Sequence, residues 1–130
     1  MRIISTPDAP GGSAELGGSF SYSQGVIAAG LVFVAGQGPI DPTTGAIVGE
    51  TIQEQTGQCL RNIEAILIAG GSSMPMVVNA TFILRDPSDF AGMNEEWTRW
   101  FPSNPPARQG ARHPLSVDGL RISIAAIAEA

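Results

Sequence analysis

TIQEQTGQCLRNIEAILIAG, the stretch over residues 51–70, decides the fold class because it carries the start, the apolar stripe and the stop of one long helix. Thr51 and Glu54 have the spacing of a capping box, in which two side chains satisfy backbone N–H groups at the helix start. Polar residues such as Gln55 fall opposite the apolar stripe, whose side chains recur at helical spacing: Ile52, Cys59, Leu60, Ile63, Ile66 and Leu67. Gly70 and Gly71 stop the helix, since glycine adopts the left-handed conformation without a steric penalty. The stretch therefore predicts an amphipathic helix in which Cys59 is a small buried hydrophobe.

Strand signals lie on both sides of this helix. Residues 26–35, VIAAGLVFVA, predict a hairpin that turns at Ala29 and Gly30, and the uniformly apolar second arm indicates burial on both faces. Residues 76–84, MVVNATFIL, are apolar and β-branched, as is typical of a central strand. Residues 107–113 and 120–128 predict the last two strands, joined by a turn over 114–119.

A second helix is predicted from Asp86 and Pro87, which suit the N-cap and the first helical position. Aromatic and apolar side chains then recur every three or four residues, which favours a core-facing stripe: Phe90, Met93, Trp97, Trp100 and Phe101. Asn94 lies on the flank of that stripe. A polar amide at such an edge needs a partner, so we expect it to bond a nearby loop.

The economical arrangement is one domain over residues 1–130, of the α+β class. Two helices would cover one face of a sheet of about six strands. The other sheet face then stays uncovered, and we expect the protein to associate with itself through that apolar face.

The composition excludes several kinds of chemistry. All seven cationic side chains are arginine, so the chain cannot use a Schiff-base lysine or a lysine-bearing phosphate loop. One cysteine and one histidine cannot supply a Cys/His zinc site or an intramolecular disulfide. A net charge of −5 disfavours binding to nucleic acid. With no signal-like or membrane-spanning apolar run, we expect a cytoplasmic protein.

Arg108 is the most informative polar residue. Pro105 and Pro106 stiffen the chain before it, and a guanidinium fork held at a strand start suits a carboxylate. Side chains alternate along a strand, so Arg108, Gly110 and Arg112 share one face, and Gly110 leaves room there for a small ligand. An internal ion pair or a solvated surface position for Arg108 remains open at this point.

Three further candidates carry weaker signals. Tyr22, the single tyrosine, lies among small polar residues and could line a pocket mouth, or pack as a partly buried ring. Gly36 follows a buried strand in Gly36-Gln37-Gly38-Pro39, where small residues let a ligand approach backbone amides. His113 precedes Pro114 and is interpreted as a surface turn residue.

Taken in order, these segments resemble one known family. The matching stretches are Tyr22-Ser23-Gln24, Leu31-Val32-Phe33-Val34-Ala35-Gly36-Gln37, Ile40-Asp41-Pro42-Thr43-Thr44-Gly45, Asp89-Phe90-Ala91 with Asn94, Pro106-Ala107-Arg108 and Ile124-Ala125-Ala126-Ile127-Ala128. Together, over residues 20–128, they look like the RidA family of reactive-intermediate (enamine/imine) deaminases, also known as the endoribonuclease L-PSP or translation-inhibitor family.

This resemblance implies a fold and an activity. The implied fold is a chorismate-mutase-like α+β fold, with a mixed sheet, in homotrimers that enclose a central barrel and have ligand clefts between subunits. The implied reaction is hydrolysis of 2-enamine or 2-imine acids to 2-keto acids and ammonia, without a cofactor and without a metal. Arg108 would bind the substrate carboxylate, with Tyr22, Gly36 and Asn94 as neighbouring substrate-binding residues.

The chain also departs from the family pattern. The family's C-terminal strand usually has a glutamate where this chain has Ala125. The family usually has a serine before Gly36-Gln37, where this chain has Ala35, and often a cysteine two residues after the arginine, where this chain has Gly110. Ser123 is the nearest polar side chain to Ala125, on the same strand face. A divergent deaminase and a non-deaminating protein that binds a small carboxylate metabolite therefore both remain open. The charge disfavours the third reading, an endoribonuclease or translation inhibitor.

Overall fold

The capping box and the glycine stop both form around helix α1 (Ile52–Ala69), in a computed structural model that describes residues 1–11 and 21–130. Thr51 Oγ1 accepts a hydrogen bond from the Glu54 N–H at 3.1 Å, and the Thr51 N–H donates to Glu54 Oε1 at 3.3 Å. Beyond the helix, Gly71 is left-handed with φ +85°, and the Ser72 N–H donates to the Leu67 carbonyl at 2.8 Å. These two bonding patterns confirm the predicted helix at both ends.

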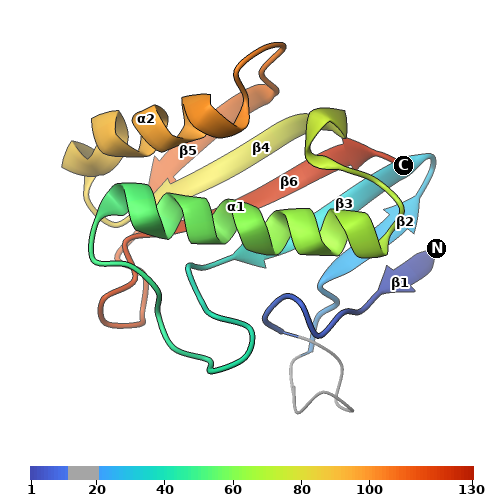
Figure 1. Ribbon diagram of the computed structural model, residues 1–130, viewed down its shortest axis with the longest axis horizontal. Helices are drawn as coiled ribbons and strands as arrows, with labels where there is room; N and C mark the ends of the chain where they lie inside the picture. The colour runs from blue at the N-terminus through green and yellow to red at the C-terminus, as the bar shows by residue number, and fades with distance from the viewer. Residues whose placement is uncertain (12–20) are drawn as a thin grey trace.

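The strands form one six-stranded mixed sheet in the order β1-β2-β3-β6-β4-β5 (Figure 1). Their bounds are Arg2–Ile4 for β1, Gly25–Ala28 for β2, Leu31–Gln37 for β3, Val77–Leu84 for β4, Ala107–Arg112 for β5 and Ile122–Glu129 for β6. The short edge strand β1 has no counterpart in the sequence-based prediction. The other five strands were predicted, and the α+β class is confirmed.

The predicted hairpin is formed by β2 and β3, which pair in antiparallel fashion with Ala28 opposite Leu31. Ala29 has φ 53° and Gly30 has φ 75°. Two consecutive residues with positive φ make a type I′ turn, whose twist matches the flanking strands. The turn lies where the sequence predicted it.

The turn over 114–119 suggested that β5 and β6 pair with each other. Instead, β4 lies between them. It pairs antiparallel with β6 and parallel with β5, so the last two strands of the chain lie on either side of it. A parallel pair cannot be joined by a tight turn and needs a crossover. Here the crossover consists of a short 3₁₀ turn, Pro87–Asp89, and helix α2 (Phe90–Trp100).

The start of this crossover follows its sequence signal. Asp86 Oδ1 accepts a hydrogen bond from the Ser88 N–H at 2.9 Å. That bond, and more weakly the charges of Arg112 and Arg121, hold the pKa of Asp86 below its usual value. The predicted N-cap is therefore confirmed, although the first turn is 3₁₀ and the α-helix begins only at Phe90.

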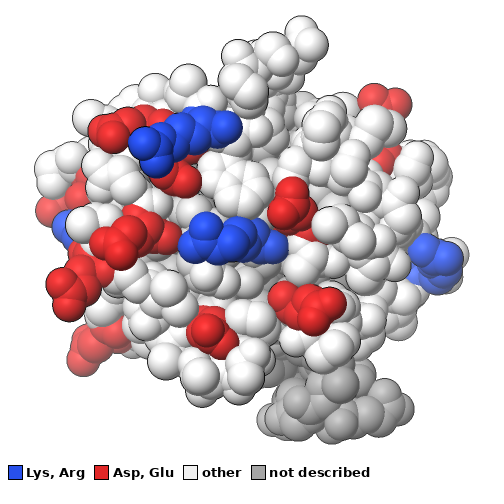
Figure 2. All heavy atoms as spheres, viewed as in Figure 1, with Lys and Arg blue, Asp and Glu red and all other residues white. Residues whose placement is uncertain are grey.

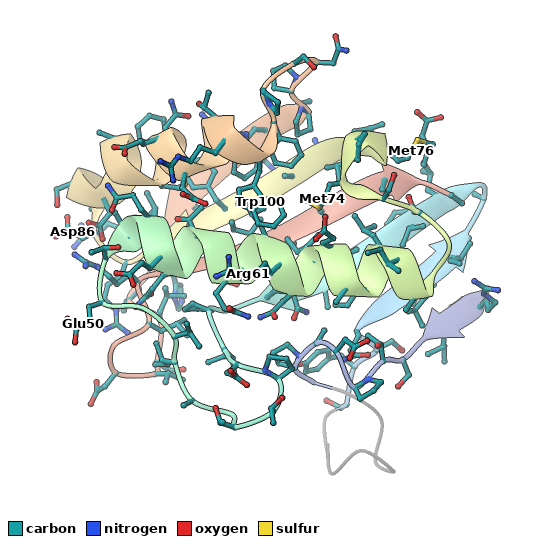
Figure 3. The ribbon with its side chains drawn as sticks, viewed as in Figure 1. Glu50, Arg61, Met74, Met76, Asp86 and Trp100 are labelled. Atoms are coloured by element: carbon teal, nitrogen blue, oxygen red, sulfur yellow. The ribbon has the colours of Figure 1, made fainter. Side chains whose placement is uncertain are left out.

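Both helices lie on the same face of the sheet and bury the core against it (Figure 1). Trp100 reaches from α2 toward α1 (Figure 3) and packs against the core. Cys59 is a fully buried residue of α1, and burial raises the pKa of its thiol far above the usual value. Cys59 is therefore the small core hydrophobe that the sequence predicted. A second 3₁₀ turn, Met74–Met76, leads from α1 to β4.

The opposite face of the sheet is apolar and open. Along β6, buried residues alternate with half-buried ones that face away from the helices: Ser123, Ala125 and Ile127. On β3, Val32 and Val34 are buried whereas Phe33 is 40% exposed. The prediction that β3 is buried on both faces is therefore wrong for the single chain, because helices cover one face only.

Charges of both signs are interspersed on the helix-covered side of the molecule (Figure 2). Arg99 pairs with Glu96 at 3.6 Å, and Arg61 Nε donates to Gln58 Oε1 at 3.3 Å. Arginines on this side form no continuous basic stripe. Within residues 1–11 and 21–130, no helix is both long enough and apolar enough to cross a membrane.

We expect Thr51→Ala to lower the free energy of unfolding by about 1 kcal/mol, the usual cost of losing an N-cap. Urea denaturation followed by circular dichroism measures this change. Thr43→Ala is the matched control, because Thr43 is also an exposed threonine but lies in a loop. Equal unfolding midpoints for the two variants would contradict the role of the capping box.

Candidate functional site

Arg108, the second residue of β5, lies beneath α2 at the edge of the sheet. Its Nη1 donates a hydrogen bond to Asn94 Oδ1 at 2.9 Å. The expectation that Asn94 bonds a loop is therefore wrong. The crossover lays α2 along β5, so the amide on the flank of the helix meets a strand residue instead.

Three aromatic rings surround the guanidinium. Its central carbon lies 5.1 Å from the ring centre of Trp97, 5.3 Å from that of Phe82 and 5.5 Å from that of Phe90. Cation–π contacts of this kind each contribute about 0.5–2 kcal/mol. The rings thus fix the orientation of the Arg108 fork while leaving its charge unneutralised.

The predicted aromatic stripe of α2 packs in or against the core except at Phe90. Met93, Trp97 and Phe101 are buried and Trp100 is partly buried against them, whereas Phe90 is 44% exposed and its ring faces Arg108 and Phe82. Phe90 occupies the first turn of the helix, past the edge of the core. An exposed ring at this position is part of the candidate site rather than of the core.

Arg108 makes no ion pair with a described residue. Among residues 1–11 and 21–130, ion pairs join Arg99 to Glu96 and Arg121 to Asp89. An internal carboxylate partner, one of the alternatives that the sequence left open, is therefore excluded for this part of the chain. The guanidinium is half-buried, so the purely solvated alternative does not describe it either.

Gly110 shares the strand face of Arg108, but the space beside it is not empty as the sequence suggested. A Cβ at this position would lie 2.1 Å from the ring of Phe82. The ring therefore occupies the volume that a side chain at position 110 would need. The open space lies next to that ring, as a cavity of about 370 Å³ lined by Phe82, Leu84, Pro87, Phe90, Gly110, Ala111 and Arg112.

Tyr22 and Gly36 lie away from Arg108 within one chain. Tyr22 is 52% exposed just before β2, and its hydroxyl approaches the backbone at Gly11. Gly36 lies on β3, where a Cβ would face Ser123 Oγ at 3.3 Å on the open face of the sheet. Strands β6 and β4 separate β3 from β5. The structure thus joins Arg108 to Asn94 and places the other two candidates elsewhere.

Of the departures from the family pattern, Gly110 shares the face of Arg108, whereas Ala125 lies on this open face. Ala125 and Ser123 both alternate with buried residues of β6 and so share the open side of the sheet, as the sequence predicted. Ala35 and Gly36 belong to the end of β3, next to β6. Two hydroxyl side chains lie near Ala125 on this face: Ser123, two residues away on the same strand, and Thr81, directly opposite Ala125 on β4.

A second cavity, of about 660 Å³, contains polar residues that the sequence analysis did not single out. Arg121 there pairs with Asp89 at 3.1 Å and donates to the Glu50 carbonyl at 2.8 Å. Gln55 is buried, against its expected position on the polar side of the helix, and bonds the carbonyl of Gly119 at 2.8 Å. These groups satisfy one another and tie loops to α1, so they explain packing rather than chemistry.

His113 is an exposed turn residue, in agreement with its interpretation from the sequence. Its Nδ1 accepts a hydrogen bond from the Leu115 N–H at 3.1 Å, which closes the turn locally. In the described part of the chain, no group of three or more His, Cys, Asp or Glu side chains is placed to hold a metal ion.

Comparison with known proteins places the chain among relatives of known structure. Residues 13–130 match the family model described as endoribonuclease L-PSP. A RutC family protein of Pyrococcus horikoshii is 45% identical over 107 residues, covering 82% of this chain and 85% of that protein. The human 2-iminobutanoate/2-iminopropanoate deaminase is 36% identical over 127 residues, covering 98% of this chain and 88% of that enzyme. The crystal structure of E. coli TdcF with bound serine superposes with a TM-score of 0.88 at 32% identity, covering 100% of this chain and 99% of TdcF.

We expect the side-chain protons of Arg108 to resonate upfield of those of Arg99, whose side chain is 75% exposed. The three aromatic rings around Arg108 shift its proton signals upfield, and substitution of one ring abolishes part of this shift. Heteronuclear NMR of arginine-labelled protein measures the difference. Trp97→Leu should move the Arg108 signals toward those of Arg99, and unchanged signals in that variant would argue against the ring cage.

Proposed function

The chain belongs to the endoribonuclease L-PSP family, which includes the RidA and RutC proteins, and on that premise we propose that it binds 2-imino and 2-oxo acids and hydrolyses the former to 2-keto acids and ammonia. In this function the protein acts in the cytoplasm and needs no cofactor. The observation that carries it is the Arg108 guanidinium, which has no described ion-pair partner and contacts two rings, Phe82 and Phe90, that also line a cavity.

The surroundings of Arg108 favour a carboxylate ligand. The rings of Phe82, Phe90 and Trp97 cover its faces, and Asn94 engages Nη1. The remaining N–H groups of the fork can then form two parallel hydrogen bonds to a carboxylate. Since the group is half-buried, these charge-assisted bonds are less screened than on an open surface. The bound serine of TdcF is a ligand that also carries a carboxylate.

We further propose that the site is completed in a homotrimer. Gly36 and Ser123 lie on the open sheet face, whereas Arg108 faces α2 on the other side of the sheet. Packing of the open apolar faces into a central barrel would bury Phe33 and bring Gly36 and Tyr22 of one subunit toward Arg108 of the next. The substrate would then bind in clefts between subunits.

The reaction needs a water molecule and a proton relay. Water adds to C2 of the imine, the C=N bond becomes a C–N single bond, and the protonated nitrogen leaves as ammonia while C=O forms. Arg108 holds the carboxylate and so fixes C2 for attack. The family's glutamate is replaced by Ala125, and loss of a general acid–base group usually costs about 10²–10⁴-fold in rate. We therefore expect slow turnover, with the hydroxyls of Ser123 and Thr81 as the described groups near Ala125 that can orient water.

Ala125 also supports a second candidate function, binding of a carboxylate metabolite without deamination. In that case Arg108 retains its role and C2 is never attacked. Binding and turnover distinguish the two candidates, because both require affinity and only the first requires ammonia release. The interspersed surface charges and the net charge of −5 give no support to a ribonuclease.

We expect Arg108→Ala to weaken binding of 2-oxobutanoate by at least about tenfold, since each charge-assisted hydrogen bond contributes roughly 1.5–3 kcal/mol. Isothermal titration calorimetry measures the affinity, and ammonia release from 2-aminoacrylate generated in situ measures turnover. Arg99→Ala is the control, because Arg99 is exposed on α2 and pairs with Glu96. Unchanged affinity in Arg108→Ala would refute the binding site. Ammonia release at the buffer rate, with binding intact, would favour the second candidate.

Sedimentation equilibrium should give three times the chain mass of 13.5 kDa. Phe33→Asp should shift the protein toward monomer, because it places a charge in the centre of the proposed apolar interface. Val117→Asp is the control, since Val117 is an exposed apolar residue outside the sheet. A monomeric unmodified protein would contradict the proposed assembly.

A further inference from the structure

The cavity beside Arg108 is distinct from the carboxylate contact itself. It has a volume of about 370 Å³, and six of its lining residues are apolar or glycine: Phe82, Leu84, Pro87, Phe90, Gly110 and Ala111. Phe82 and Phe90 also form part of the ring cage around Arg108. Arg108 itself does not line the cavity, so these two rings connect the cavity to the guanidinium, and the remainder of a carboxylate ligand held by Arg108 would extend along them.

Phe82 and Gly110 together give this cavity its shape. The two residues pair across β4 and β5, and a Cβ on Gly110 would lie 2.1 Å from the Phe82 ring. The ring can lie flat over the strand because position 110 has no side chain. Phe90 meets Phe82 with ring centres 5.9 Å apart, which gives the cavity a second aromatic wall.

From this geometry we propose that the cavity binds the side chain of the 2-imino or 2-oxo acid, and that the protein selects branched aliphatic or aromatic side chains over a methyl or ethyl group. This inference rests on the proposed carboxylate contact at Arg108. A group the size of a water molecule fills roughly 30 Å³, so the methyl group of pyruvate would leave most of the cavity unfilled. A larger apolar side chain exchanges water contact for contact with the two rings.

Arg112 is the charged residue of the lining, and its position does not favour a charged ligand side chain in the cavity. Its side chain is exposed, and it interacts electrostatically with Asp86 rather than with the ring walls. A ligand with a second carboxylate would have to place that charge along an apolar surface, which is unfavourable without a partner. The lining thus favours an uncharged side chain.

Calorimetric titration of the unmodified protein with a series of 2-oxo acids tests the proposal. The series consists of pyruvate, 2-oxobutanoate, 4-methyl-2-oxopentanoate, phenylpyruvate and 2-oxoglutarate. Each buried CH₂ group strengthens binding about fourfold. We therefore expect 4-methyl-2-oxopentanoate and phenylpyruvate to bind at least about tenfold more tightly than pyruvate.

Two substitutions locate the effect. Phe82→Leu removes one ring wall and should weaken phenylpyruvate at least about fivefold more than pyruvate, because loss of the contact with Arg108 affects both acids, whereas only the phenyl group extends along that wall. Phe101→Leu is the matched control, since Phe101 has the same 8% exposure as Phe82 but does not line the cavity. Gly110→Ala forces the Phe82 ring to move and should also reduce the preference. Should that variant fail to fold, the ligand series and Phe82→Leu decide the question.

The possible failures are distinguishable. Equal affinities for pyruvate and phenylpyruvate, with binding still lost in Arg108→Ala, would overturn the side-chain cavity and leave the proposed function intact. Tightest binding of 2-oxoglutarate would overturn the apolar selection in favour of a second anionic contact. Binding of none of the acids would overturn the proposed function and this inference together.

Discussion

Parallel pairing of β4 with β5 is the constraint on which the candidate site depends. Two parallel strands cannot be joined by a tight turn, so the chain must cross the sheet between them. The crossover helix α2 lands on the face that Arg108 also uses, and its first two turns provide Phe90, Asn94 and Trp97. The guanidinium is thus oriented by the segment that precedes it in the chain. The same pairing puts Phe82 of β4 next to Gly110 of β5.

The two faces of the sheet differ in polarity and in what covers them. On the helix side, buried amides of α1 hold the loops in place: Asn62 bonds the carbonyls of Gly38 and Ile40, and Gln55 bonds that of Gly119. On the open side, apolar residues such as Phe33 remain in contact with solvent in the single chain. A fold that rigidifies one face and leaves the other apolar is suited to assembly. It also explains why Gly36 and Arg108 face different directions within one chain.

The sequence was sufficient for features that depend on neighbours along the chain. The capping box of Thr51, the left-handed stop at Gly71 and the turn at Ala29 and Gly30 all use contacts within a few residues, and each was predicted. Strand order was not, because turn residues mark where a strand ends but not which strand lies beside it. For the same reason the sequence singled out Arg108 and Asn94 separately, and neither their bond nor the ring of Phe82 could be read from spacing.

The overlap between position 110 and the ring of Phe82 also restricts the order in which this lineage can acquire substitutions. A side chain at position 110 has no room while a phenyl ring lies over it. A smaller residue at position 82 is tolerated first, at the cost of a void in the core. A change of ligand preference that uses both positions should therefore begin with a smaller residue at position 82 and continue with a side chain at position 110. The opposite order would first produce a protein destabilised by the overlap at position 110.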